Sequence, residues 1–145
     1  MPKWELGRLY TMANVFLWPS RGEGYGLPAL EALACGLPVL ASNHSAHLEF
    51  LTKAGKPRSG VELINGHLEL YDKGDSVYYP GFRWFMPSIE DMRKKMRMIY
   101  EHYETYKKEA LETSKEIRKE FDWKISTQKI IYRLEDIYKT KFHHF

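Results

Sequence analysis

A glycine-rich stretch early in the chain limits the possible folds of this sequence more than any other segment. Residues 15–18 form a short apolar run that predicts a strand buried on both faces of a parallel sheet. Residues 21–26 then place glycines at alternate positions, so the backbone can bend sharply and leave its N–H groups bare. Pro28 suits the first turn of a helix, Gly36 its end, and a second apolar run follows. The stretch therefore predicts strand, loop, helix and strand, one repeat of a parallel α/β fold.

Two carboxylates stand out in that frame. Glu23 lies in the glycine-rich loop, and Glu31 follows about one turn into the helix, in an otherwise uncharged segment. Because a helix N-terminus offers free N–H groups and a positive dipole end, it is a ready site for phosphate. A phosphate beside two carboxylates that accept hydroxyl protons indicates a sugar nucleotide. Each residue alone also fits a plainer interpretation, Glu23 as a solvated loop residue and Glu31 as an acid favoured by the helix dipole.

Other phosphate-binding motifs fit this stretch poorly. A dinucleotide fingerprint needs a third glycine where Leu27 stands, and the chain contains no G-x-x-x-x-G-K-[ST] loop. Instead, the sequence EGYGLPALE from Glu23 to Glu31, followed by ALACGLPVLAS, resembles the E-x7-E signature of retaining GT-B glycosyltransferases, the glycosyl transferases group 1 family. Residues 9–10 and 13–20 also resemble that family. The resemblance implies a partial Rossmann-like parallel sheet, the second half of a GT-B C-terminal lobe, with C-terminal helices.

The resemblance also implies roles for individual residues. Glu23, as the candidate catalytic residue, would contact and orient the hydroxyls of the donor sugar. Glu31 would accept the ribose hydroxyls of the nucleotide, and the loop amides would face the diphosphate. The implied substrate-binding set is Glu23, Gly24, Tyr25, Gly26, Leu27 and Glu31. No metal or other cofactor is expected, since the chain has no D-x-D triplet and the family works without a metal.

By the same resemblance, these residues lack the acceptor-binding lobe, the first strands of the donor lobe and the family's basic pair. Arg21 lies beside the loop but is not assigned to that pair. We therefore expect weak donor binding and negligible transfer in isolation, unless a partner chain supplies the missing lobe. An incomplete sheet exposes an edge, which predicts self-association. The alternative is a non-catalytic module that binds a nucleotide sugar or a protein.

Length and composition indicate one ordinary domain. With 145 residues and 43% hydrophobic content, the chain can bury a real core. We expect residues 1–86 to form the partial donor-binding lobe and residues 87–145 the C-terminal helices of the same domain. Cys35, the single cysteine, is expected to pack rather than react, and the cytoplasm is the expected compartment. A net charge of +3 is too small to indicate nucleic acid, which is not expected as a partner.

The rest of the first part of the chain reads as short elements. Residues 4–13 predict a helix, and residues 43–53 a turn and short helix with Asn43 or Ser45 as its cap. The Asn65-Gly66 pair predicts a hairpin between two short strands, with a further strand at residues 77–79. His44 and His47 are read as loop or capping residues. The aromatics around this region fit packing better than a sugar or base site, and they are Tyr71, Tyr78, Tyr79, Phe82, Trp84 and Phe85.

From Pro87 onward the pattern is helical. Ser88 and Asp91 resemble a capping box, and the helix that follows has a basic face that fits either a solvated surface or, less well, an anionic membrane. A helix over residues 107–120 and another over residues 124–139 are predicted. The last helix is expected to turn an apolar stripe inward, formed by Ile130, Ile131, Leu134, Ile137 and Tyr138. The resemblance implies that this helix crosses back to the missing lobe, so that the stripe lacks part of its partner.

Overall fold

A computed structural model describes residues 3–70 and 81–142 of the chain. The described elements, in chain order, are α1 (Lys3–Thr11), β1 (Phe16–Trp18), α2 (Leu27–Ala34), β2 (Val39–Ser42), α3 (Leu48–Leu51), β3 (Thr52–Lys53), β4 (Lys56–Pro57), β5 (Val61–Ile64), β6 (Gly66–Leu70), β7 (Arg83–Pro87), α4 (Ile89–Glu101), α5 (Tyr103–Glu120) and α6 (Trp123–Phe142).

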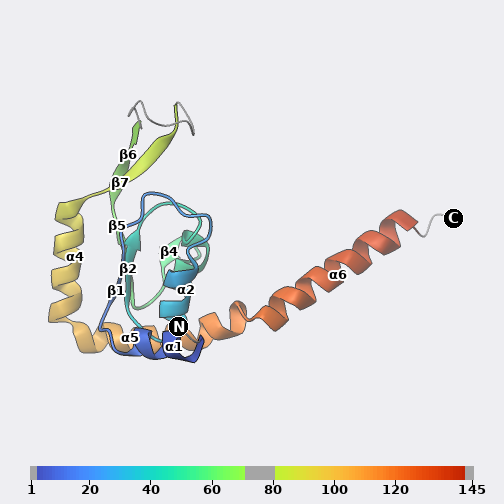
Figure 1. Cartoon of the computed structure of the whole chain (residues 1–145), viewed down its shortest axis with the longest axis horizontal. Coiled ribbons are helices and arrows are strands. Elements are labelled where there is room, and N and C mark those ends of the chain that lie inside the picture. Colours follow the sequence, from blue (N-terminus) through green and yellow to red (C-terminus); the bar gives the residue numbers. More distant parts are fainter. Residues whose placement is uncertain (1–2, 71–80, 143–145) are drawn as a thin grey trace.

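A parallel sheet in the order β1-β2-β5 forms the centre of the described part of the molecule (Figure 1). Its register pairs Phe16 with Val39 and Val39 with Val61. β2 is buried along its whole length, as expected for the middle strand of a sheet covered on both faces. The predicted α/β class with a parallel sheet and C-terminal helices is therefore confirmed.

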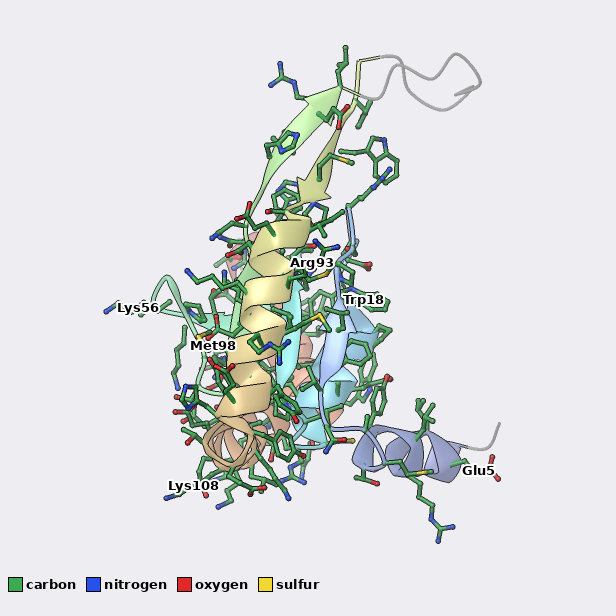
Figure 2. The ribbon with its side chains drawn as sticks, turned by 90° about the vertical axis from the view of Figure 1, so that its left-hand side faces the viewer. Glu5, Trp18, Lys56, Arg93, Met98 and Lys108 are labelled. Carbon is green, nitrogen blue, oxygen red and sulfur yellow. The ribbon has the colours of Figure 1, made fainter. Side chains whose placement is uncertain are left out.

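Helices cover the two faces of this sheet. On one face, α2, α3 and α5 enclose the larger core, in which Leu33, Phe50 and Ile117 are almost fully buried. On the other face, α4 lies over the sheet and packs Ile99 against Leu40 and Ile64. Figure 2 shows α4 in front of the sheet, with Arg93 and Met98 labelled on it and Trp18 on β1. The loop that follows β1 is thus carried by a strand with helices on both sides of its sheet.

Local sequence signals set the bounds of α2. Pro28 lies in its first turn, where a missing N–H costs no hydrogen bond. Cys35 is its C-terminal cap, and Gly36 follows with a φ of 80°, a left-handed conformation that favours glycine. The predicted strand, loop, helix and strand succession is therefore confirmed.

The hairpin predicted at Asn65-Gly66 is wrong. The run before it, β5, pairs in parallel with β2, while β6 pairs antiparallel with β7 and forms a separate arm (Figure 1). β5 is apolar enough to be buried as the third strand of the main sheet, which outweighs a local turn preference. Asn65 N–H donates to Asp91 Oδ2 at 2.7 Å and holds the chain between the two sheets. The strand predicted at residues 77–79 lies outside the described residues.

The predicted caps had different outcomes. Neither Asn43 nor Ser45 caps α3, because that helix begins at Leu48 with His47 at its N-cap and no side-chain capping bond. In contrast, Ser88 does cap α4, since its Oγ accepts the N–H of Asp91 at 3.2 Å. The carboxylate of Asp91 turns instead to Asn65 and Lys95.

The expectation that the last helix turns its apolar stripe inward is wrong. In Figure 1, α6 extends away from the rest of the described chain. Ile130, Leu134 and Tyr138 are about 60% exposed, so most of the stripe faces solvent, although Ile137 is half-buried. α5 begins at Tyr103, earlier than predicted, because it continues almost directly from α4. No helix among the described residues is both long enough and apolar enough to cross a bilayer.

Candidate functional site

The glycine-rich loop leaves β1 and is tied to the body of the fold on two sides. Ser42 Oγ, at the end of the neighbouring strand β2, donates to the carbonyl of Ser20 at 2.6 Å. On the arm, the N–H of Phe85 donates to the carbonyl of Arg21 at 3.2 Å. The loop therefore lies at the carboxyl end of the parallel strands, the edge at which open α/β sheets bind their ligands.

The side chain of Ser45 forms two hydrogen bonds with the backbone of Glu23. Its Oγ accepts the N–H of Glu23 at 2.7 Å and donates to the Glu23 carbonyl at 2.8 Å. Ser45 itself has a φ of 82°, an uncommon conformation for a residue with a side chain. Such backbone strain persists where the surroundings fix it and is frequent at functional sites. The Glu23 side chain is half-buried.

Gly26 is the N-cap residue of α2 and lies against the core. Its φ is 85°, and a Cβ placed on it would lie only 2.8 Å from His47 Cβ. His47 is fully buried, and its Nε2 donates to the carbonyl of Ser42 at 2.7 Å. Glycine is therefore the residue that this close approach requires.

The amino end of α2 keeps its positive dipole available. Gly26 offers no side-chain capping bond, and the first turn of the helix contains no acidic residue. The plainer interpretation of Glu31 as a first-turn acid is accordingly wrong, because Glu31 lies beyond that turn. An uncapped helix start attracts an anion through its free N–H groups.

Glu31 lies on the exposed side of α2 and contacts α1. The hydroxyl of Tyr10 donates to Glu31 Oε2 at 3.0 Å. Burial of the tyrosine, together with the hydrogen bond and negative charge of Glu31, raises the pKa of Tyr10 to about 12. The hydroxyl therefore remains a donor at neutral pH.

An open groove of about 730 Å³ runs beside α2 and brings part of the predicted set together. Tyr25, Leu27 and Glu31 line it, whereas Glu23, Gly24 and Gly26 do not. The opposite wall comes from the junction of α5 and α6, a region that sequence reasoning did not assign to the site. Its side chains include Arg118, Phe121, Asp122 and Trp123. The available signal is the aromatic break between the two helices predicted over residues 107–120 and 124–139, where Phe121 and Trp123 interrupt the helical pattern.

Three buried polar atoms near the loop have no hydrogen-bond partner within the described part of the chain. They are Trp18 Nε1, Ser20 Oγ and His47 Nδ1. Since the Ser42 carbonyl can only accept, His47 Nε2 carries a proton. Buried polar groups are normally paired, so their absence of partners here is compatible with a polar ligand.

Of the remaining candidates in this region, His44 and Phe85 pack against each other. His44 stacks on the buried ring of Phe85, with ring centroids 5.0 Å apart. Phe82 and Trp84 lie on the arm and are exposed, whereas Tyr71, Tyr78 and Tyr79 lie outside the described residues. No group of three or more metal-binding side chains occurs among residues 3–70 and 81–142.

Cys35 behaves as a packing residue. It is half-buried against the larger core, and burial raises the pKa of its thiol. A thiol with a raised pKa is a poor nucleophile, so the predicted packing role of Cys35 agrees with its surroundings.

Comparison with known proteins identifies the class. The family model described as "Family 4 Glycosyltransferase in conflict systems" matches residues 3–130, most of the chain. The chain belongs to this family of glycosyltransferases.

Named relatives are similar over parts of the chain. The chain is 40% identical over 70 residues to O-antigen chain mannosyltransferase B of Escherichia coli, covering 47% of the chain and 18% of that protein. It is 28% identical over 127 residues to sulfoquinovosyl transferase SQD2 of Arabidopsis thaliana, covering 87% of the chain and 20% of the relative. A D-inositol 3-phosphate glycosyltransferase of Acidothermus cellulolyticus is 40% identical over 67 residues, 46% of the chain and 14% of the relative. The chain thus spans a fifth or less of the length of these three relatives.

Proposed function

We propose that this chain is the donor-binding part of a retaining glycosyltransferase and binds a nucleotide-diphosphate sugar. The observation that carries the proposal is the uncapped amino end of α2, where a glycine-rich loop meets a groove that exposes the carboxylate of Glu31. Such a helix start suits a diphosphate, and a carboxylate in an adjoining groove suits hydroxyls. Membership of a glycosyltransferase family supports the same conclusion.

In this proposal each predicted residue has a separate task. The amides of residues 24–27 and the helix dipole stabilise the diphosphate as negative charge develops on the leaving group. Glu31 accepts the ribose hydroxyls, and Glu23 orients the sugar. The two hydrogen bonds between Ser45 Oγ and the backbone of Glu23 support this role, because they fix the backbone that carries the Glu23 side chain. The sugar then passes to an acceptor hydroxyl with retention of its anomeric configuration.

We further propose that transfer requires a second lobe. Within the described residues, β1 pairs with a strand on one side only. Beside it, a groove of about 710 Å³ is lined by apolar side chains that include Val15, Leu17 and Ile99. The stripe of α6 is a second apolar surface, on which Ile130 and Leu134 are exposed to solvent. A chain that supplies the acceptor lobe, or self-association, would cover such surfaces.

The donor-binding proposal is tested by calorimetric titration of the chain with UDP-, GDP- and ADP-sugars, for the wild type, Glu31→Gln and Glu135→Gln. Glu135 is an exposed glutamate of α6, so it controls for the loss of one negative charge. Hydrogen bonds to a charged group contribute about 1.5–3 kcal/mol, so Glu31→Gln should weaken binding roughly 10- to 100-fold.

Glu135→Gln should bind as the wild type does. Absence of binding to all three donors by a folded wild-type chain would overturn the proposal. It would favour the alternative of a module that binds a protein. Light scattering on the same samples tests self-association, and a monomer at all concentrations would contradict that part.

A further inference from the structure

A buried tyrosine from outside the loop forms a hydrogen bond with the carboxylate that faces the groove. Tyr10 belongs to α1, and its hydroxyl reaches across to Glu31 Oε2 at 3.0 Å. The tyrosine side chain is only 9% exposed, and its ring meets Phe16 edge-on, with centroids 5.8 Å apart. The hydroxyl is therefore held by packing and not by its hydrogen bond alone.

This contact changes what the glutamate can do. An exposed glutamate on a helix has several rotatable bonds and normally samples many rotamers. Tyr10 fixes one carboxylate oxygen of Glu31 while the side chain remains exposed along the groove. Because a carboxylate has about four lone-pair sites, Glu31 can still accept two further hydroxyl donors. The carboxylate is thus oriented before a ligand arrives, which lowers the entropy lost on binding.

Tyr10 itself does not line the groove, in contrast to Tyr25 and Trp123. Its hydrogen bond to Glu31, which does line the groove, links it to the candidate binding surface. The high pKa of Tyr10 keeps its proton in place at neutral pH, so the hydroxyl acts as a constant donor.

We infer that Tyr10 is a positioning residue that orients Glu31 toward both ribose hydroxyls and so makes the groove prefer ribonucleotides over 2′-deoxyribonucleotides. The inference rests on the proposed function, because it assumes that a nucleotide occupies the groove. It adds to that function a determinant of sugar recognition contributed by α1, outside the glycine-rich stretch.

The test compares UDP, GDP and ADP with their 2′-deoxy forms by calorimetry, on the wild type, Tyr10→Phe and Glu31→Gln. Tyr10→Phe keeps the ring and its contact with Phe16, so it should fold, and a melting curve checks this. Loss of one ordinary hydrogen bond corresponds to roughly a 5- to 10-fold effect. Tyr10→Phe should weaken the ribonucleotide by about that factor, leave the 2′-deoxy form within about twofold, and bring the ratio of the two affinities toward one.

The outcomes separate the two proposals. The proposed function stands if the wild type prefers the ribonucleotide and Glu31→Gln abolishes that preference. The inference is nevertheless wrong if Tyr10→Phe keeps the wild-type ratio of the two affinities or weakens the binding of both forms equally. If the folded wild type binds none of the nucleotides, the proposed function is wrong and the inference falls with it. A double variant of Tyr10→Phe and Glu31→Gln that behaves like Glu31→Gln alone would support action through the glutamate.

Discussion

Replacing Gly26 by alanine should destabilise the fold strongly, although the change adds a single methyl group. Two costs combine. A side chain at a φ of 85° costs about 1–2 kcal/mol. The new Cβ would also lie 2.8 Å from His47 Cβ and 3.7 Å from Phe50 Cζ, inside the core. Overpacking of this kind costs about 1–3 kcal/mol, which gives a total of about 2–5 kcal/mol.

His47 has little room to relieve this contact. It is fully buried, and its Nε2 is bonded to the Ser42 carbonyl, so a shift of the ring would lengthen that bond. The matched control is Gly24→Ala in the same loop. A Cβ on Gly24 would meet no atom within 4 Å, and the residue lacks a positive φ. Gly24→Ala should therefore change the free energy of unfolding by less than about 0.5 kcal/mol.

Urea unfolding followed by circular dichroism measures both variants against the wild type. For a domain of this size, the Gly26→Ala loss corresponds to a melting temperature lower by roughly 6–15 °C. Gly26→Asn separates the two costs, because asparagine tolerates the left-handed conformation but keeps the Cβ contact. Equal stability of Gly26→Ala and Gly24→Ala would refute the close approach between the loop and His47.

Three further predictions concern the helices. Ile117→Ala should lower the free energy of unfolding by about 2–5 kcal/mol, because Ile117 is buried in the larger core, whereas Leu134→Ala on α6 should change it by less than about 0.5 kcal/mol. Urea titration of both variants checks this contrast, and similar losses would contradict the exposed position of α6. Ser88→Ala should cost about 1 kcal/mol through the lost N-cap of α4, and a loss below 0.3 kcal/mol would speak against that cap. The hydrogen bond from Arg58 lowers the pKa of Glu120, so this pair stabilises the folded chain above the ordinary glutamate pKa of about 4.3 and loses that effect as the pH falls through the lower folded value. In melting curves between pH 7 and pH 3, the melting temperature of Arg58→Met should therefore fall less steeply with acid than that of the wild type. Parallel curves would argue against the pair.

Local signals predicted the centre of this fold because they are strong and mutually consistent there. Pro28 and Gly36 mark a helix that fits between two buried apolar runs, and each choice agrees with a parallel sheet. The same reasoning failed at Asn65-Gly66, because burial of β5 against β2 depends on residues distant in the sequence. A turn preference of a few tenths of a kcal/mol cannot outweigh the burial of a whole apolar strand.

The candidate site was predictable only in part for the same reason. Glu23 and Glu31 stand out from their neighbours in the sequence, and they remain the proposed ligand-binding pair. The partner of Glu31, in contrast, lies 21 positions away in Tyr10, and the far wall of the groove comes from Phe121 and Trp123. Nothing in the local pattern of these residues reveals contacts that arise when distant helices pack. The stripe on α6 likewise indicates an amphipathic helix but not what covers it.

NMR can test whether the start of α2 and its loop bind the diphosphate of a nucleotide. Amide chemical shifts of the 15N-labelled chain would be followed while UDP, GDP and ADP are added in turn. We predict that one nucleotide produces its largest, saturable shifts at the amides of Gly24, Tyr25, Gly26 and Leu27, with smaller shifts at Glu31 and Trp123. Saturable shifts confined to other parts of the chain, or no shifts with any of the three nucleotides, would contradict the claim.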